Sequence, residues 1–323
     1  MRIDKKLKKL GITNIVKIES ETVRNISVKV IELLAKEFPF LEEQYNNMLA
    51  KLMTCNMYSA EMNANISKVN YIYENRSIYI DRTVDLTELN SLIASECIHY
   101  IQDCRYESKK LSSFGICEFN DFAILGFGLN EAMVKYISLK VFDETSMITT
   151  NRLVALAKDV LELLDEKILI KGVLIPSDKT QDYILNTFEN DMKKILKKFD
   201  TILELYNMRS YGNTFELENS IVRTYYETKK KIYTSYFDKT IDKLESREEV
   251  EEFYAKIKRY EDSLTDIFEQ NEFKTFVDSL SYKMQTAVMR VNKIEKQRSL
   301  MIISKNKFQK VVDRLKQMFN LAG

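Results

Sequence analysis

The chain is organised around one apolar segment that holds its only histidine: Leu89-Asn90-Ser91-Leu92-Ile93-Ala94-Ser95-Glu96-Cys97-Ile98-His99-Tyr100-Ile101-Gln102. Apolar residues recur on nearly every side of a helix of this sequence, so the pattern predicts a buried helix at about 87–105, capped by Asp85 or Thr87. Glu96 and His99 then lie in apolar surroundings. Because an unpaired buried charge is strongly unfavourable, we expect each of them to have a partner, a metal or a shifted pKa.

The composition predicts a mainly α protein with a small β-sheet, in the α+β class. Seven glycines and two prolines in 323 residues favour long, uninterrupted elements. The chain has 49 Lys and Arg against 48 Asp and Glu, a formal net charge of +1. This balance creates no field that would attract nucleic acid or an acidic membrane, so we expect neither as a partner.

The sequence also predicts a cytoplasmic protein. The basic amino terminus is not followed by the apolar core of a secretory signal, and the longest apolar run, at 122–129, is far below the ~20 residues that a membrane span needs. The four cysteines, at 55, 97, 104 and 117, form no CxxC pair. We therefore expect free thiols in a reducing compartment.

The rest of the chain divides into a mixed and a helical part. Residues 69–73 and 77–80 are rich in β-branched and aromatic residues and predict a hairpin at about 69–80, with 57–64 as a possible third strand. A second, nearly all-apolar helix is predicted at about 119–142. We place a domain boundary near Pro176, giving domains 1–175 and 176–323. The second domain is predicted to be a helical bundle or long helical hairpin, with a capping box formed by Ser246 and Glu249.

Glu96-Cys97-Ile98-His99, followed by Asn130-Glu131 on the second helix, resembles the zincins, and specifically the glutamate-zincin branch that includes the thermolysin-like peptidases. That family carries His-Glu-x-x-His on one helix and Asn-Glu-x-x-x-acid on a later one, and binds catalytic zinc through the two histidines and the later glutamate. The resemblance covers roughly residues 57–142. It implies that residues 1–175 form a zincin-like domain, in which the edge strand of a small sheet binds extended substrate.

The resemblance assigns Glu96 to the general base that activates the metal-bound water. It assigns His99 to the second histidine ligand and Glu131, after Asn130, to the third ligand. These positions match the family pattern.

Two other positions depart from the pattern. Ser95 stands where the first histidine ligand belongs, and Lys135 stands where the family has an acid that supports that histidine. A serine hydroxyl is a poor zinc ligand, and a lysine would repel a metal. We expect Lys135 to pair with Glu131 at i, i+4, and His99 to pair with Glu96 or Glu131. Glu96, His99 and Glu131 are then vestigial.

The leading hypothesis is a catalytically inactive, zincin-like pseudo-metallopeptidase that acts as a binding or regulatory module for a peptide or protein partner, with no cofactor. A peptide-binding groove beside the hairpin edge is part of this hypothesis. The alternative is an active zinc metallopeptidase with a shifted ligand set around His99 and Glu131 and with Glu96 as base. A further alternative is a purely structural helical interaction protein in which His99 is a satisfied core histidine. The sequence predicts no oligomeric state.

Overall fold

The computed structural model describes residues 3–105, 111–119, 124–209, 211–260, 263–264 and 266–320. The chain is mainly helical, as predicted, and the predicted small β-sheet is present: the described residues form one four-stranded and two two-stranded sheets. It forms two compact units, residues 1–232 and 233–323, hereafter the first and second unit. None of the helices in the described ranges combines the length and apolar character needed to cross a membrane.

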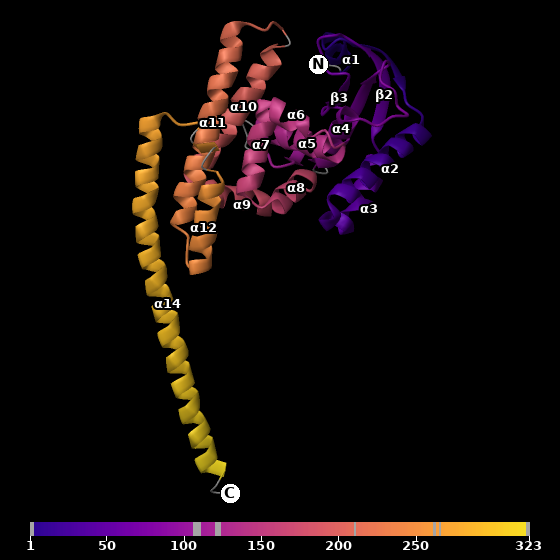
Figure 1. Ribbon diagram of the computed structural model, residues 1–323. Helices are drawn as coiled ribbons and strands as arrows, with labels where there is room; N and C mark the ends of the chain where they lie inside the picture. The colour runs from indigo at the N-terminus through magenta and orange to yellow at the C-terminus, as the bar shows by residue number, and fades with distance from the viewer. Residues whose placement is uncertain are drawn as a thin grey trace. The chain divides into compact units, whose positions relative to one another are not determined.

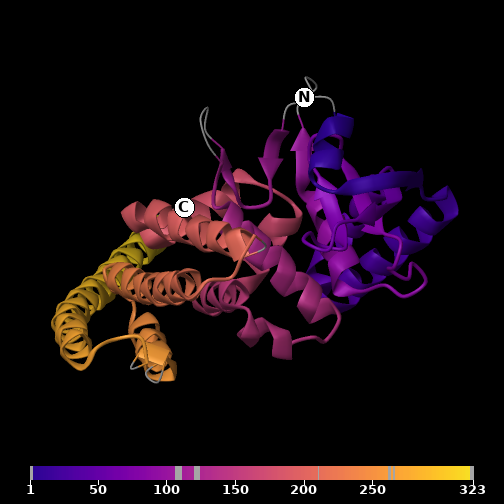
Figure 2. The ribbon, with the colours of Figure 1, turned by 90° about the horizontal axis from the view of Figure 1, so that it is seen from above.

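The four-stranded sheet has the order β1-β2-β4-β3, so that β1 and β3 are its edges. The sheet lies in the indigo to purple part of the chain (Figures 1 and 2). Its strands are β1 (Ile12–Lys17), β2 (Asn56–Met62), β3 (Val69–Ile72) and β4 (Ser77–Asp81). Strands β3 and β4 form the predicted hairpin, with Tyr71 opposite Ile78. Strand β2 lies at the predicted third-strand position and runs parallel to β4. Strand β1 was not predicted, because only Ile12 of its residues is buried.

Helices cover both faces of this sheet. Helix α1 (Ile3–Lys9) packs on one face through Leu7, which shares a small apolar cluster with Tyr79 of β4. Helix α2 (Ser20–Glu37), the 3-10 helix η1 (Pro39–Gln44) and helix α3 (Tyr45–Leu52) follow. Both α2 and α3 contact α4, which itself packs on β3 and β4. The sheet and these helices therefore enclose the histidine-bearing helix.

That helix, α4, spans Ser91–Gln102, which is shorter than the predicted 87–105. Its N-cap is Asn90, whose side chain accepts a hydrogen bond from Ile93 N at 3.0 Å. Asp85 is not the cap, because its carboxylate accepts hydrogen bonds from the backbone and hydroxyl of Thr87 in a local turn. The chain leaves the helix directly into strand β5 (Asp103–Arg105), which pairs with β6 (Leu111–Phe114).

The second apolar helix, α5, spans Phe127–Val141, so its predicted start at 119 is wrong. The chain instead forms short strands β7 (Glu118–Phe119) and β8 (Ile124–Leu125); residues 120–123 lie outside the described residues. Gly126 then turns with a φ of 88°, a left-handed conformation that a helix interior cannot contain.

The predicted boundary near Pro176 does not coincide with the division between the units, which falls after Ile232. Helix α10 packs against α5: Asp200 accepts hydrogen bonds from Gly126 N at 2.9 Å and Gly128 N at 2.7 Å. Gly128 is needed there, because a Cβ atom would lie 2.3 Å from the carbonyl oxygen of Phe199. Helix α10 spans Met192–Arg209, and the described helices between α5 and α10 are α6 (Ser146–Thr150), α7 (Arg152–Leu163), α8 (Glu166–Leu174), α9 (Asp178–Phe188) and η2 (Glu189–Asp191).

The second unit is built from the end of α11 (Phe215–Ile241), α12 (Arg247–Arg259) and α14 (Gln270–Asn320). The predicted capping box is present at the start of α12, where the Ser246 and Glu249 side chains each bond to the other's backbone. Figure 1 shows α14 as one long helix that continues past α12.

Candidate functional site

Helices α4 and α5 pack antiparallel and bring the predicted site residues together. As residue numbers rise along α4, those of the partners on α5 and just after it fall. Three hydrogen bonds and one ion pair show this order: Ser91–Glu144 at 2.9 Å, Ser95–Ser138 at 2.8 Å, Gln102–Asn130 at 3.1 Å and the ion pair His99–Glu131 at 3.3 Å. This packing, which is not readable from either helix alone, places His99 beside Glu131.

His99 is 4% exposed, and both of its ring nitrogens face oxygen atoms. Nε2 lies 3.3 Å from Glu131 Oε2, and Nδ1 lies 3.3 Å from Gln102 Oε1. Burial lowers the pKa of His99, but the charge and hydrogen bond of Glu131, with Glu96 and Gln102, outweigh it and raise the pKa to about 9. In its protonated form the imidazole donates from both nitrogens in this arrangement, and the Phe114 ring stacks on it with the ring centroids 5.7 Å apart. The predicted pairing of His99 with a carboxylate is confirmed.

Glu96 faces the edge strand of the sheet. Its Oε2 accepts a hydrogen bond from Tyr71 N at 2.8 Å. Burial raises the pKa of Glu96 to about 7, with His99 lowering it and Glu131 raising it further. Since β3 is an edge strand, Glu96 occupies a backbone donor that an added peptide strand would use. The carbonyl of Tyr73, just beyond β3, accepts a hydrogen bond from Arg105. This edge is thus already bonded at two points, which disfavours the predicted peptide groove.

Asn130 and Gln102 form a fully buried amide pair beneath the histidine. Asn130 Oδ1 accepts hydrogen bonds from Gln102 Nε2 at 3.2 Å and from Ile116 N at 3.3 Å, while its Nδ2 donates to Gln102 Oε1 at 3.1 Å. Gln102 was missed by sequence reasoning. Its signal was a polar residue three positions after His99 on an otherwise apolar helix, where the two side chains share a face.

Among the described hydrogen bonds and ion pairs, none joins Ser95 or Lys135 to His99 or Glu131. The Ser95 hydroxyl donates to Ser91 O at 2.9 Å and lies 2.8 Å from Ser138 Oγ. Lys135 is exposed, and the predicted Glu131–Lys135 ion pair does not occur among the ion pairs of the described residues, where Glu131 pairs with His99. Glu131 accepts the closer, buried cation in place of a solvated lysine.

The donor set does not fit a catalytic zinc site. Such a site takes three protein ligands and leaves one position for water. Here only His99 and Glu131 face one another, Ser95 is turned to Ser138, and Glu96 to the sheet edge. Across the described ranges, no group of three or more His, Cys, Asp and Glu side chains is arranged to hold a metal ion. The four cysteines are free thiols, as predicted.

A second buried cluster lies immediately after α4 and was not predicted. The Asp103 side chain is fully buried; its Oδ2 accepts hydrogen bonds from Tyr71 Oη and Arg105 Nη2, both at 2.6 Å. Its Oδ1 accepts from Arg105 Nε at 2.7 Å and lies 3.6 Å from Arg76 Nε. Tyr71 therefore joins the two clusters, through its backbone to Glu96 and through its hydroxyl to Asp103.

Comparison of the chain with protein-family models, curated proteins and solved structures finds no match. The functional reading thus rests on the residues and their geometry.

Proposed function

We propose that this protein is a non-catalytic, zincin-like protein that acts in the cytoplasm by binding a peptide or protein partner. In this proposal the residues that a zincin uses to hold zinc now stabilise the packing of α4 on α5. Residues 57–142 supply the scaffold, and no metal takes part.

The observation that carries the proposal is the state of His99. Both ring nitrogens face oxygen acceptors, Glu131 at Nε2 and Gln102 at Nδ1, each at 3.3 Å. Glu131 and Gln102 thus supply partners for both ring nitrogens, and the charge and hydrogen bond of Glu131 raise the pKa of His99 against the effect of burial. Ser95, at the position of the missing ligand, already has hydrogen-bond partners. Four free cysteines support a reducing compartment.

Elemental analysis of the purified full chain tests the proposal directly. We expect far less than one zinc per chain after the protein is incubated with zinc and then dialysed against metal-free buffer. Stoichiometric zinc that survives dialysis, together with hydrolysis of a peptide library, would support instead the peptidase with a shifted ligand set.

A gain-of-function variant tests the zincin relationship. Ser95→His combined with Lys135→Asp supplies the missing histidine one turn before His99, and the acid that would orient it. We expect zinc affinity to rise at least about tenfold over the wild type, because a third ligand completes the site. The matched control is Ser91→His with Lys135→Asp, which adds the same residues but puts the histidine two turns from His99. Equal zinc affinity in both folded variants would refute the relationship.

A further inference from the structure

The second unit carries two opposite charges on separate parts of its chain. Residues 233–288 contain thirteen Asp and Glu against eight Lys and Arg, whereas residues 290–316 contain nine Lys and Arg against two Asp and Glu. The near-zero net charge of the whole chain is thus the sum of an acidic part at 233–288, the acidic body, and a basic part at 290–316, the basic end of α14. Such charge separation favours association of the basic end with an acidic surface.

The first part of the basic end meets the acidic body of its own chain, and the part beyond Arg298 leads away from it. The described contacts of α14 with the rest of its unit include Lys283–Asp238 at 2.5 Å, Arg247–Glu295 at 3.0 Å and Arg298–Glu245 at 3.6 Å. Helix α14 then continues without a break to Asn320, at about 1.5 Å per residue, or about 33 Å beyond Arg298. Arg247 at the start of α12 lies beside Asn292 and Glu295, so α12 runs back along α14 and away from its basic end.

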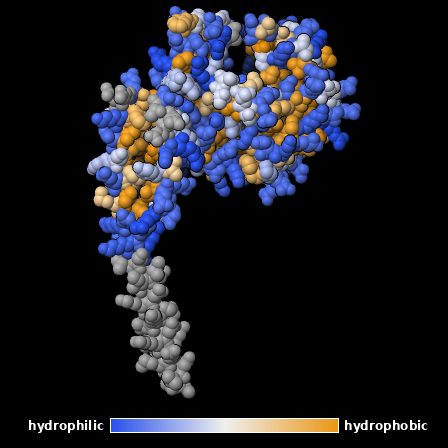
Figure 3. All heavy atoms as spheres, in the orientation of Figure 1, coloured by the Kyte–Doolittle hydropathy of each residue, from blue (hydrophilic) through white to orange (hydrophobic). Residues whose placement is uncertain are grey.

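An apolar groove lies between α12 and the first part of α14. Its volume is about 380 Å³, and its lining includes Tyr254, Ile257, Leu264, Phe273, Phe276 and Met284. Tyr254 is 64% exposed and Val277 is 40% exposed. Figure 3 shows apolar side chains gathered along the first half of α14. Exposed apolar surface of this kind is typical of a docking site.

We infer that this groove and the acidic start of α12 receive the basic end of α14 from a second copy of the chain, in an antiparallel, two-fold symmetric dimer. Each copy offers both the acidic surface and the basic helix, so one symmetric interface satisfies both pairs. The formal net charge of +1 leaves little overall repulsion between copies. An isolated helix end is only marginally stable in water, which favours an arrangement that covers it.

The spacing along the helices supports this register. Glu248 and Glu251 are exposed, three residues apart, just after Arg247. Lys307 and Lys310 have the same spacing on α14. Within one copy, Glu248 is level with Asn292, because its neighbour Arg247 bonds to Asn292. If Lys307 of the antiparallel second copy lies at this level, residue 319 of that copy lies level with Leu280 of the first. Both intervals are twelve residues, or about 18 Å. Leu280 lines the groove, so the apolar end of the sequence reaches the apolar site.

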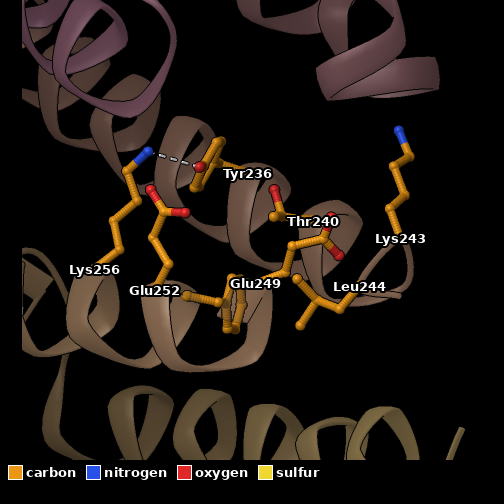
Figure 4. Close-up of a pocket in the computed structure, with 8 residues that line it drawn as sticks. Tyr236, Thr240, Lys243, Leu244, Glu249, Glu252 and Lys256 are labelled. Atoms are coloured by element: carbon orange, nitrogen blue, oxygen red, sulfur yellow. Dashed lines mark hydrogen bonds between the residues drawn. The ribbon is translucent and has the colours of Figure 1, made fainter. Parts of the chain in front are cut away.

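Glu249 and Glu252 are less suited to contact a second chain. Figure 4 shows both on the side of α12 that faces α11, around a cleft of about 290 Å³. In this cleft Lys256 donates a hydrogen bond to Tyr236 Oη at 2.8 Å. Glu249 also caps α12. Glu248 and Glu251 are therefore the residues to test.

Sedimentation equilibrium of the full chain tests the dimer. We expect a dimer that weakens about tenfold when salt rises from about 0.05 to about 0.5 M. Glu248→Lys with Glu251→Lys, or Lys307→Glu with Lys310→Glu, should each raise the dissociation constant about 30-fold, because like charges then face each other. All four changes in one chain should restore it to within about threefold of the wild type.

The control is Lys5→Glu with Lys8→Glu, the same charge change on exposed residues of α1, which should leave the dissociation constant unchanged. A monomeric wild type would overturn the inference. So would a quadruple variant whose dissociation constant is no lower than those of the two double variants. A monomer whose Lys307→Glu/Lys310→Glu variant loses binding to phosphatidylserine vesicles would also overturn it, in favour of a membrane surface.

Discussion

Two buried polar clusters share Tyr71 but differ in the kind of charge they contain. In one, Asp103 is held by the guanidinium groups of Arg105 and Arg76. In the other, His99 lies between Glu131 and Gln102, with Glu96 nearby. Guanidinium groups stay charged at all ordinary pH values, whereas imidazole titrates near neutrality and burial raises the pKa of Glu96 to about 7. The positive charges of the first cluster therefore do not change in the ordinary pH range, whereas charges of the second do. We call the first the permanent cluster and the second the titratable cluster.

This difference separates structural burial of charge from burial that could serve chemistry. Perturbed pKa values near neutrality are common at catalytic sites, but ion-pair networks inside a core produce them too. Here Glu96 bonds to the sheet edge and Glu131 to His99. These contacts use the titratable cluster to pack α4 against its neighbours, which is the physical basis of the non-catalytic proposal.

The largest effect is expected from Asp103→Ala. The change leaves Arg105 and the Tyr71 hydroxyl without their buried acceptor, and breaking a buried pair costs about 3–5 kcal/mol. Urea unfolding followed by circular dichroism measures the loss. Asp85→Ala is the control, because its carboxylate is exposed and accepts hydrogen bonds from Thr87 in a local turn. Equal urea midpoints for the two variants would show that the buried contacts of Asp103 contribute no more to stability than the exposed turn at Asp85.

The titratable cluster predicts stability that falls with rising pH. The pKa of His99 is raised from 6.5 to about 9, so the folded chain keeps a proton that the unfolded chain has lost. This stabilisation is complete below pH 6.5 and disappears as pH rises through about 9. The pKa of Glu96 is raised from 4.5 to about 7, and stability falls in the same way between those values. Each window has a slope of up to about 1.4 kcal/mol per pH unit.

Two variants separate the windows. Glu131→Gln removes the main cause of the raised His99 pKa and should flatten the wild-type curve between pH 6.5 and 9. Glu96→Gln can still accept the Tyr71 hydrogen bond and should flatten the curve between pH 4.5 and 7. Urea unfolding across pH gives both curves. A Glu131→Gln curve parallel to the wild type would contradict the His99–Glu131 pair as the source of the upper window.

Sequence reasoning found the ionisable residues of the titratable cluster but not its Gln102, nor the residues of the permanent cluster. Glu96 and His99 stood out because they interrupt an apolar helix, and Glu131 because of its spacing in a second helix. Asp103 follows the helix end, where a charged residue is ordinary, so only the return of β6 and the hairpin shows that it is buried. Gln102 was missed for a similar reason, because its partner Asn130 lies 28 residues away.

The fold shows the same limit. Hairpin, capping box and helical composition are local patterns, and each was predicted. The start of α5 was wrong because Gly126 and the Asp200 cap are needed to define it, and Asp200 is supplied by a helix 72 to 74 residues later. The same contact keeps α10 in the first unit. No local pattern around Pro176 carries that information.

The smallest effect is expected from Ser95→Ala, which tests whether the missing ligand position retains a role. The serine hydroxyl is partly buried and bonds to Ser91 O and Ser138 Oγ, and one such neutral hydrogen bond contributes about 1 kcal/mol. Alanine's higher helix propensity offsets about half of this, so unfolding should change by only about 0.5 kcal/mol. A double-mutant cycle with Ser138→Ala isolates the hydroxyl pair, with a coupling of about 0.5–1 kcal/mol. A loss above about 3 kcal/mol would equal that expected for Asp103. It would mean that Ser95 is not a neutral replacement for a lost ligand but part of the polar core itself.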